Sequence, residues 1–342
     1  MEELSQRKEA ILKAVVVEHV RTAEPVGSKA IAEKYPIGIG PAMIRHELAD
    51  MSERGYLEQP YTSAGRIPSD TGYRYYVNRL VEPVIPPEAQ RRVREVLRGE
   101  KGVNELLVET CRLLSRLTHY VAAAFALREQ ATTIRHVFLS GISSQKVLIT
   151  VVYGAGIVEN RIIDATPDTT LQDIHYVSKV LETLLVNRTI RAISRMSAPQ
   201  ENYLKPAAQQ LLLRAWKSIR TLCSQLVSGK IISEGATFLV SQPEFRRDYD
   251  AFQKVIAILE NEQMLKEAID EPTEDSVTVK IGEENELDAL KDLAVITSKF
   301  YLEEQEAGTI AVIGPTRMDY DSTIALVREA AKALSSAISK LL

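Results

Sequence analysis

The sequence is poor in cysteine and histidine and has no long apolar run. Its 342 residues include 2 Cys and 5 His. Cys111 and Cys223 are far apart in the chain and form no CxxC pair, which argues against a disulfide framework and a zinc knuckle. The histidines have no short metal-ligand spacing, so we expect no metal and no other cofactor. Since no run of about 18 uncharged apolar residues occurs, no transmembrane helix is expected.

A basic excess is absent as well. The formal net charge is −4, and residues 1–80 hold 11 Lys and Arg against 11 Asp and Glu. Nucleic-acid-binding domains are often strongly basic, so any affinity for DNA must come from the local placement of cations. The first residues are acidic and then amphipathic, unlike a secretory signal. Together with the unpaired cysteines, this start predicts a cytoplasmic protein.

The composition that is present is that of an ordinary globular protein. Hydrophobic residues make up 45% of the chain and charged residues 26%. The length predicts two or three domains, and helical and strand periodicities both occur, so we expect an α+β multidomain fold. No convincing acid–base pair or nucleophile stands out, and we therefore do not expect an enzyme.

The first 55 residues predict three short helices separated by turns. Apolar spacing places the helices at residues 5–21, 29–35 and 41–54. Ser5 and Ser28 are suitable N-caps for the first two. Pro41 suits the first position of the third helix, and Gly55 suits its end. This succession predicts a helix-turn-helix, whose third helix would lie in the major groove of DNA.

The third helix has one apolar and one accessible face. Ile44, Leu48 and Met51 recur at helical spacing and should pack on the first two helices. The other face carries small residues that allow close approach, with Arg45 able to contact guanine and His46 able to make a polar contact.

A two-stranded wing is predicted after the third helix. Residues 56–58 and 66–68 bracket a polar loop, and a further helix begins after Ser69. Residues 61–66 offer hydroxyls, backbone N–H groups and one guanidinium, which suit phosphate or the minor groove. From these patterns alone, an ordinary folded surface with a hairpin remains an equally good interpretation.

The rest of the chain predicts one sheet interrupted by an insertion. A proline-containing linker at residues 83–87 precedes a long helical stretch at 88–127. The remaining helices are predicted at residues 171–185, 249–270 and 321–341, with residues 187–245 chiefly helical. Strands are predicted at residues 136–140, 146–153, 157–164, 277–281, 293–300 and 309–313. Three strands, a helical interval and three more strands favour a single interrupted sheet.

Two groups of motifs resemble those of a known family. EPVGSKAIAEKY and YLEQPYTSAGRIPSDTGYRYYV occur near the N-terminus, and IGEEN (281–285) and GPTRMDY (314–320) occur some 200 residues later. The sequence resembles HrcA, the bacterial heat-inducible transcription repressor, over essentially its whole length. The resemblance departs at Gly40, Met43 and His46, where relatives tend to carry residues that cap the helix or bond to bases.

The resemblance implies a fold and a domain order. It implies a winged-helix DNA-binding domain at residues 1–82, a GAF-like domain at 83–186 and 246–342, and an inserted dimerisation domain at 187–245. It further implies a homodimer that represses the GroE and DnaK chaperone operons at an inverted-repeat operator called CIRCE. The GroE chaperonin is implied as a modulator that keeps the repressor competent until heat diverts it to unfolded clients.

The residues expected to act follow from the helix-turn-helix, the wing and the resemblance together. The predicted DNA contacts are Ser28, Lys29, Gly40, Pro41, Ala42, Met43, Arg45, His46, Thr62, Ser63, Gly65 and Arg66. The predicted dimer contacts are Leu211, Leu212, Trp216 and Ile219, which could instead be core residues.

Two alternatives stay open at this point. The same DNA-binding region could serve a regulator whose sheet domain binds a small-molecule effector. The GPTRMDY block could line such a pocket, or it could form a turn in which Arg317 pairs with Asp319.

Overall fold

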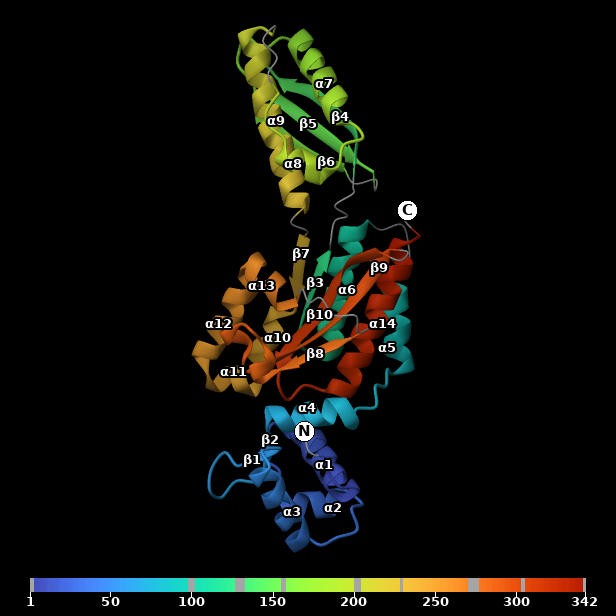
Figure 1. The fold of residues 1–342 in the computed structure, drawn as a ribbon, viewed down its shortest axis with the longest axis vertical. Coiled ribbons are helices and arrows are strands. Elements are labelled where there is room, and N and C mark those ends of the chain that lie inside the picture. The colour runs from blue at the N-terminus through green and yellow to red at the C-terminus, as the bar shows by residue number, and fades with distance from the viewer. Residues whose placement is uncertain are drawn as a thin grey trace. The chain divides into compact units, whose positions relative to one another are not determined.

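The chain forms two compact units of mixed α and β structure. The structure is a computed structural model that describes residues 3–97, 102–126, 133–154, 158–199, 204–227, 230–269, 277–302 and 305–340. The first unit joins residues 1–125 to 231–341, and the second comprises residues 126–230. Figure 1 shows the order of the elements within each unit. The expected α+β multidomain fold is therefore found.

The N-terminal part of the first unit, residues 3–80, is called the head here. It consists of α1 (Gln6–Thr22), α2 (Ser28–Lys34), α3 (Pro41–Glu53), the antiparallel strands β1 (Leu57–Glu58) and β2 (Ile67–Pro68), and α4 (Asp70–Arg79). The Ser5 side chain caps α1, and Ser69 caps α4 by accepting from the Gly72 N–H at 3.1 Å. The predicted helices, hairpin and capping residues of the head are confirmed, except that Gly27 caps α2 in place of Ser28.

The rest of the first unit, residues 81–125 and 231–340, is called the body. Its centre is a five-stranded sheet in the order β7-β3-β10-β9-β8. The strands are β3 (Val121–Ala126), β7 (Lys230–Glu234), β8 (Thr278–Ile281), β9 (Leu293–Leu302) and β10 (Gln305–Pro315). Every residue of β3 is buried, as expected for a strand in the middle of a covered sheet.

Helices cover both faces of this sheet (Figure 1). One group consists of α5 (Pro87–Val96), α6 (Val103–Thr118) and α14 (Tyr320–Ile338). The other consists of α10 (Ala236–Ser241), α11 (Pro243–Arg247), α12 (Tyr249–Glu260) and α13 (Glu262–Ile269). Two short 3-10 turns, η1 (Gly282–Glu284) and η2 (Asp288–Leu290), connect β8 to β9.

The second unit has a sheet of its own. Its strands β4 (Ile134–Ser143), β5 (Lys146–Tyr153) and β6 (Val158–Asp164) are antiparallel neighbours. The helices α7 (Leu171–Leu185), α8 (Ile190–Arg195) and α9 (Pro206–Val227) pack against it and close one apolar core. No helix in the described ranges combines the length and apolar composition needed to cross a membrane.

The sheet prediction requires correction. The two groups of predicted strands lie in two separate sheets, because β4, β5 and β6 form a three-stranded sheet apart from the five-stranded one. The compact second unit therefore begins at residue 126, well before the insertion predicted at 187–245. Of the predicted strand at 157–164, only its first residue lies outside the described residues.

The helix predicted at residues 88–127 also requires correction. Its described part contains α5 and α6, but residues 121–126 form the strand β3. Alanine favours helices locally, which explains the prediction for VAAAFA. Hydrogen bonding to two neighbouring strands and complete burial override that preference in the folded chain.

The four predicted dimer contacts are core residues of the second unit. Leu211, Leu212, Trp216 and Ile219 are at most 3% exposed and belong to one apolar cluster with α7 and the sheet. Because these side chains are already packed against their own chain, they offer no surface to a second copy.

Candidate DNA-binding surface

The head holds α3 on a small apolar core. Ile44, Leu48 and Met51 on α3 are all buried, as are Ile11 and Ile31 on the two preceding helices. The predicted packing face of α3 is thereby confirmed. Since one face of α3 is fixed in this core, the residues on its other side are presented to solvent in a defined order.

Ion pairs fasten the helices of the head to one another. The Lys8 ammonium lies 2.5 Å from the Asp50 carboxylate and 3.7 Å from that of Glu47, which joins α1 to α3. Hydrogen bonding to Lys8 lowers the pKa of Asp50. These contacts help to fix the orientation of α3 relative to α1.

Glu18 joins α1 to α2. Its buried carboxylate accepts hydrogen bonds from Lys34 at 2.5 Å and from Arg21 at 2.7 Å. The bonds from Lys34 and then Arg21 hold the pKa of Glu18 below its ordinary value. A buried carboxylate with two cationic donors is well satisfied, so the turn between α1 and α2 is held firmly.

The solvent face of α3, with the residue that precedes the helix, carries six of the twelve predicted contacts. Gly40 and Pro41 are exposed at its start, and Ala42, Met43, Arg45 and His46 are exposed along it. Neither Arg45 nor His46 has a hydrogen bond or ion pair with another described residue. Small residues at the tip of the helix, followed by a guanidinium and an imidazole with free donors, suit close approach to base edges.

The hairpin after α3 presents a second exposed segment. Thr62 and Ser63 are exposed, and the Gln59 side chain holds the loop by donating to the Thr62 carbonyl at 2.9 Å and the Ala64 carbonyl at 3.1 Å. Tyr61, at 60% exposed, lies beside them and was not predicted as a contact. A large aromatic residue in an otherwise polar loop was the signal that could have identified it.

Four predicted contacts have other surroundings. Ser28 is buried, and Lys29 lies 3.8 Å from Glu33 one turn along α2. The Arg66 side chain donates to the Ser52 hydroxyl at 2.8 Å. At Gly65, a Cβ atom would lie 2.4 Å from the backbone of Val26, so this glycine allows the hairpin to pair with the turn before α2. Ser28 and Gly65 therefore have structural roles, and Arg66 is engaged inside the head.

Comparison of the chain with known proteins identifies its family. The family model "HrcA protein C terminal domain" matches residues 104–324. The heat-inducible transcription repressor HrcA of Carboxydothermus hydrogenoformans is 38% identical over 338 residues, which cover 98% of each chain. That of Desulforudis audaxviator is 34% identical over 342 residues, covering 99% of each chain.

The chain belongs to the HrcA family. These relatives bear the name of heat-inducible transcription repressors, so the family is one of transcription repressors. The fold is similar to a crystal structure titled as that of a hypothetical protein, with a TM-score of 0.66 and 20% identity over 99% of each chain. The HrcA resemblance predicted from four sequence blocks is thus confirmed over the full chain.

Proposed function

We propose that the head is a winged helix that binds DNA with α3 in the major groove and the β1–β2 hairpin beside it. The observation that carries this proposal is the solvent face of α3. Its apolar residues are buried in the head, whereas Arg45 and His46 are exposed and have no partner among the described residues. Free donors on a helix held by its opposite face are what base-edge recognition requires.

The proposed target is the CIRCE inverted repeat in front of the GroE and DnaK chaperone operons, where binding blocks transcription until heat stress. An inverted repeat has two-fold symmetry, so the proposed active form is a homodimer that engages one half-site with each head. The proposal implies that the protein acts in the cytoplasm, where it can reach the chromosome. Membership of the HrcA family supports each of these statements.

The proposed dimer surface is the outer face of the three-stranded sheet in the second unit. Phe138, Val158 and Ile162 are 49%, 51% and 58% exposed on this face. Strand pairing sets Leu148 directly opposite Ile162 and Val152 opposite Val158, so each of these positions joins apolar side chains of β5 and β6. Since exposed apolar surface favours association, we assign dimerisation to residues 126–230. We assign the GAF-like fold that the family resemblance implies to the body.

The GroE chaperonin is the proposed modulator of the repressor. A repressor with an apolar sheet face offers a surface to the GroE chaperonin whenever that face is not paired. Chaperonin occupied by heat-damaged clients would then leave the repressor unassisted, and repression would fail.

The test is binding of the full chain to a fluorescent CIRCE duplex and to a scrambled duplex. Arg45→Ala should weaken operator binding by about 1–3 kcal/mol and relax preference at one base position, because a bidentate contact to guanine is lost. Fluorescence anisotropy at fixed salt measures both constants.

Arg79→Ala is the matched control, because Arg79 is also an exposed arginine of the head, on α4, and its Nη1 lies 3.8 Å from the Glu3 carboxylate. Its operator affinity should equal that of the wild type. Equal affinity of the wild type for operator and scrambled DNA would refute the proposed function.

A further inference from the structure

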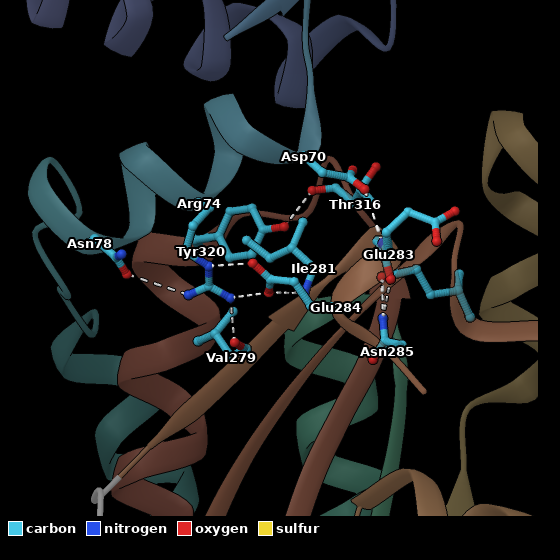
Figure 2. Close-up of polar contacts among 12 residues, drawn as sticks. Asp70, Arg74, Asn78, Val279, Ile281, Glu283, Glu284, Asn285, Thr316 and Tyr320 are labelled. Atoms are coloured by element: carbon cyan, nitrogen blue, oxygen red, sulfur yellow. Dashed lines mark hydrogen bonds and ion pairs between the residues drawn. The ribbon is translucent and has the colours of Figure 1, made fainter. Parts of the chain in front are cut away.

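Three of the four sequence blocks that carry the family resemblance meet in the folded chain. Residues of YLEQPYTSAGRIPSDTGYRYYV lie on α4 of the head, IGEEN contains η1, and GPTRMDY leads into α14. Figure 2 shows Asp70 and Arg74 of α4 facing Glu283 and Glu284 of the η1 turn. We name this contact region the joint, defined by Asp70, Arg74, Tyr76 and Arg317 with their partners.

Arg74 makes the most directional contact of the joint. Its Nε donates to the Glu284 Oε1 at 2.8 Å, and its Nη2 donates to Oε2 of the same carboxylate and to the Val279 carbonyl (Figure 2). Glu284 Oε2 also accepts from the Ile281 N–H at 2.8 Å. Because a two-pronged arginine–carboxylate pair tolerates little rotation, it fixes direction as well as distance.

Asp70 holds the same turn one helical turn earlier on α4. Its Oδ2 accepts from the Glu283 N–H at 3.1 Å. Gly282 adopts φ +57°, and a Cβ atom there would lie 1.7 Å from Asp70 Oδ2. The glycine is therefore required both by the left-handed backbone and by the close approach of the carboxylate. Asp70 and Arg74, four residues apart on one face of α4, thus both bind the η1 turn of the body.

The third and fourth points of contact involve α14 and α1. The Tyr76 hydroxyl donates to Asp321, whose other oxygen accepts from the Glu82 N–H at 2.7 Å. Arg317, only 8% exposed, donates to the Val20 carbonyl in the last turn of α1 at 3.2 Å.

Arg317 is itself fixed within the body. It pairs with Glu244 through Nε at 2.5 Å and with Gln242 through Nη2 at 2.9 Å. The predicted pairing of Arg317 with Asp319 is not found, because Asp319 caps α14 by accepting from the Ser322 N–H.

The covalent link between head and body has no regular structure of its own. Residues 81–86 form neither helix nor strand, and Val84 is 64% exposed. A short connection of this kind limits distance but leaves orientation largely free. The direction of the head is therefore set by the joint, whose contacts come from two different helices of the head.

We propose that Asp70 and Arg74 are positioning residues for operator recognition: through the joint they fix the direction of α3 and so determine which half-site spacing a dimer accepts. This inference rests on the proposed function. Each added base pair turns one half-site by roughly 34° about the DNA axis, so a head held rigidly accepts a narrow range of spacings. A head whose contacts in the joint are broken can reorient, so a dimer with such heads accepts a wider range of half-site spacings.

The experiment compares full-length wild type, Arg74→Glu, the control Arg79→Glu and the charge swap Arg74→Glu with Glu284→Arg. Affinity is measured for operator duplexes of natural spacing, for duplexes with two added base pairs, and for a single half-site. Wild type and Arg79→Glu should lose about 100-fold in affinity on the lengthened operator, because only one head engages at a time. In Arg74→Glu that loss should shrink to about threefold, single half-site affinity should be unchanged, and the swap should restore discrimination.

A measurement without DNA separates failure of this inference from failure of the proposed function. Spin labels at Glu33→Cys on α2 and Lys332→Cys on α14 report the head–body distance, with labelled chains diluted into unlabelled ones. The native cysteines are buried and do not interfere. The distribution should be narrow in wild type and Arg79→Glu and broad in Arg74→Glu.

A narrow head–body distance distribution in Arg74→Glu would show that the joint does not fix the direction of the head. A broad distribution together with an unchanged spacing preference would show that the joint plays no part in operator recognition. If Arg74→Glu does not fold, Glu284→Gln, which keeps the shape but removes the charge, is measured in its place under the same criteria. Failure of the wild type to prefer operator over scrambled DNA would contradict the proposed function while leaving the distance result to stand for the joint.

Discussion

His19 lies in α1 where the head meets the body, and its burial together with the nearby Arg317 opposes its protonation more than the carboxylates of Glu244 and Glu24 favour it. Its Nδ1 lies 2.7 Å from the Tyr73 hydroxyl. Burial, and then the positive charge of Arg317, lowers the pKa of His19 from 6.5 to about 4. Burial also keeps the Tyr73 phenol protonated by raising its pKa. The neutral imidazole is therefore the form that fits the folded chain.

The lowered pKa makes folding depend on pH. The unfolded chain binds a proton at His19 below pH 6.5, whereas the folded chain resists doing so until about pH 4. Stability is therefore full above the unfolded value and is lost as the pH falls through this window. Between pH 7 and pH 5 the loss due to His19 should be about 1–2 kcal/mol.

Urea unfolding of His19→Gln at both pH values measures this contribution, since the variant should lose less stability than the wild type on acidification. His46→Gln, which changes an exposed histidine on α3, is the control substitution. A His19→Gln protein as acid-sensitive as the wild type would show that the imidazole is not the titrating group.

At the scale of elements, local signals predicted what local interactions determine. Ser5, Pro41, Gly55 and Ser69 marked the helix boundaries of the head, because caps and left-handed turns act within a few residues. The solvent face of α3 followed from periodicity alone. The strand β3 did not, since its alanines take their conformation from neighbouring strands.

The joint could not be derived from the sequence for a related reason. Its blocks were recognised, but Arg74 and Glu284 are 210 residues apart in the chain. No periodicity indicates which acidic residue will meet a given arginine after folding. The dimer contacts on α9 were misplaced because an apolar helix face has the same pattern whether it packs on its own sheet or on a partner.

The outer face of the three-stranded sheet gives a prediction at this scale. Ile162→Glu should convert the proposed dimer to a monomer, weakening association by about 3 kcal/mol or more, because each interface would bury a carboxylate without a partner. Light scattering coupled to size-exclusion chromatography measures the mass of the full chain. Ser224→Glu introduces the same charge on the exposed side of α9 and should remain dimeric. A dimeric Ile162→Glu protein would place the interface elsewhere.

Over the whole molecule, charge is divided unevenly among the parts. Residues 126–230 hold 13 Lys and Arg against 7 Asp and Glu, whereas residues 231–342 hold 11 against 22. The neutral head thus belongs to a unit whose remainder is strongly acidic. The acidic remainder repels phosphates, so within the first unit the neutral head is the part that the long-range field opposes least in the proposed contact with DNA.

The proposed chaperonin effect is also a property of the whole chain. Adding purified GroE chaperonin to dilute repressor should raise the fraction that binds a CIRCE duplex, because apolar faces are protected from unproductive association. Titration to saturation with labelled duplex measures that active fraction. Serum albumin at equal mass is the control, and an unchanged fraction with chaperonin would contradict the effect.

The chain leaves the five-stranded sheet at the end of β3 and re-enters it in β7, and these two strands are hydrogen-bonded neighbours. The second unit is therefore an insertion between two neighbouring strands of the sheet. Such an insertion can become longer or shorter, or be replaced, over evolution without disrupting the pairing of the other strands. In this architecture the proposed dimer surface can evolve separately from the proposed DNA-reading head.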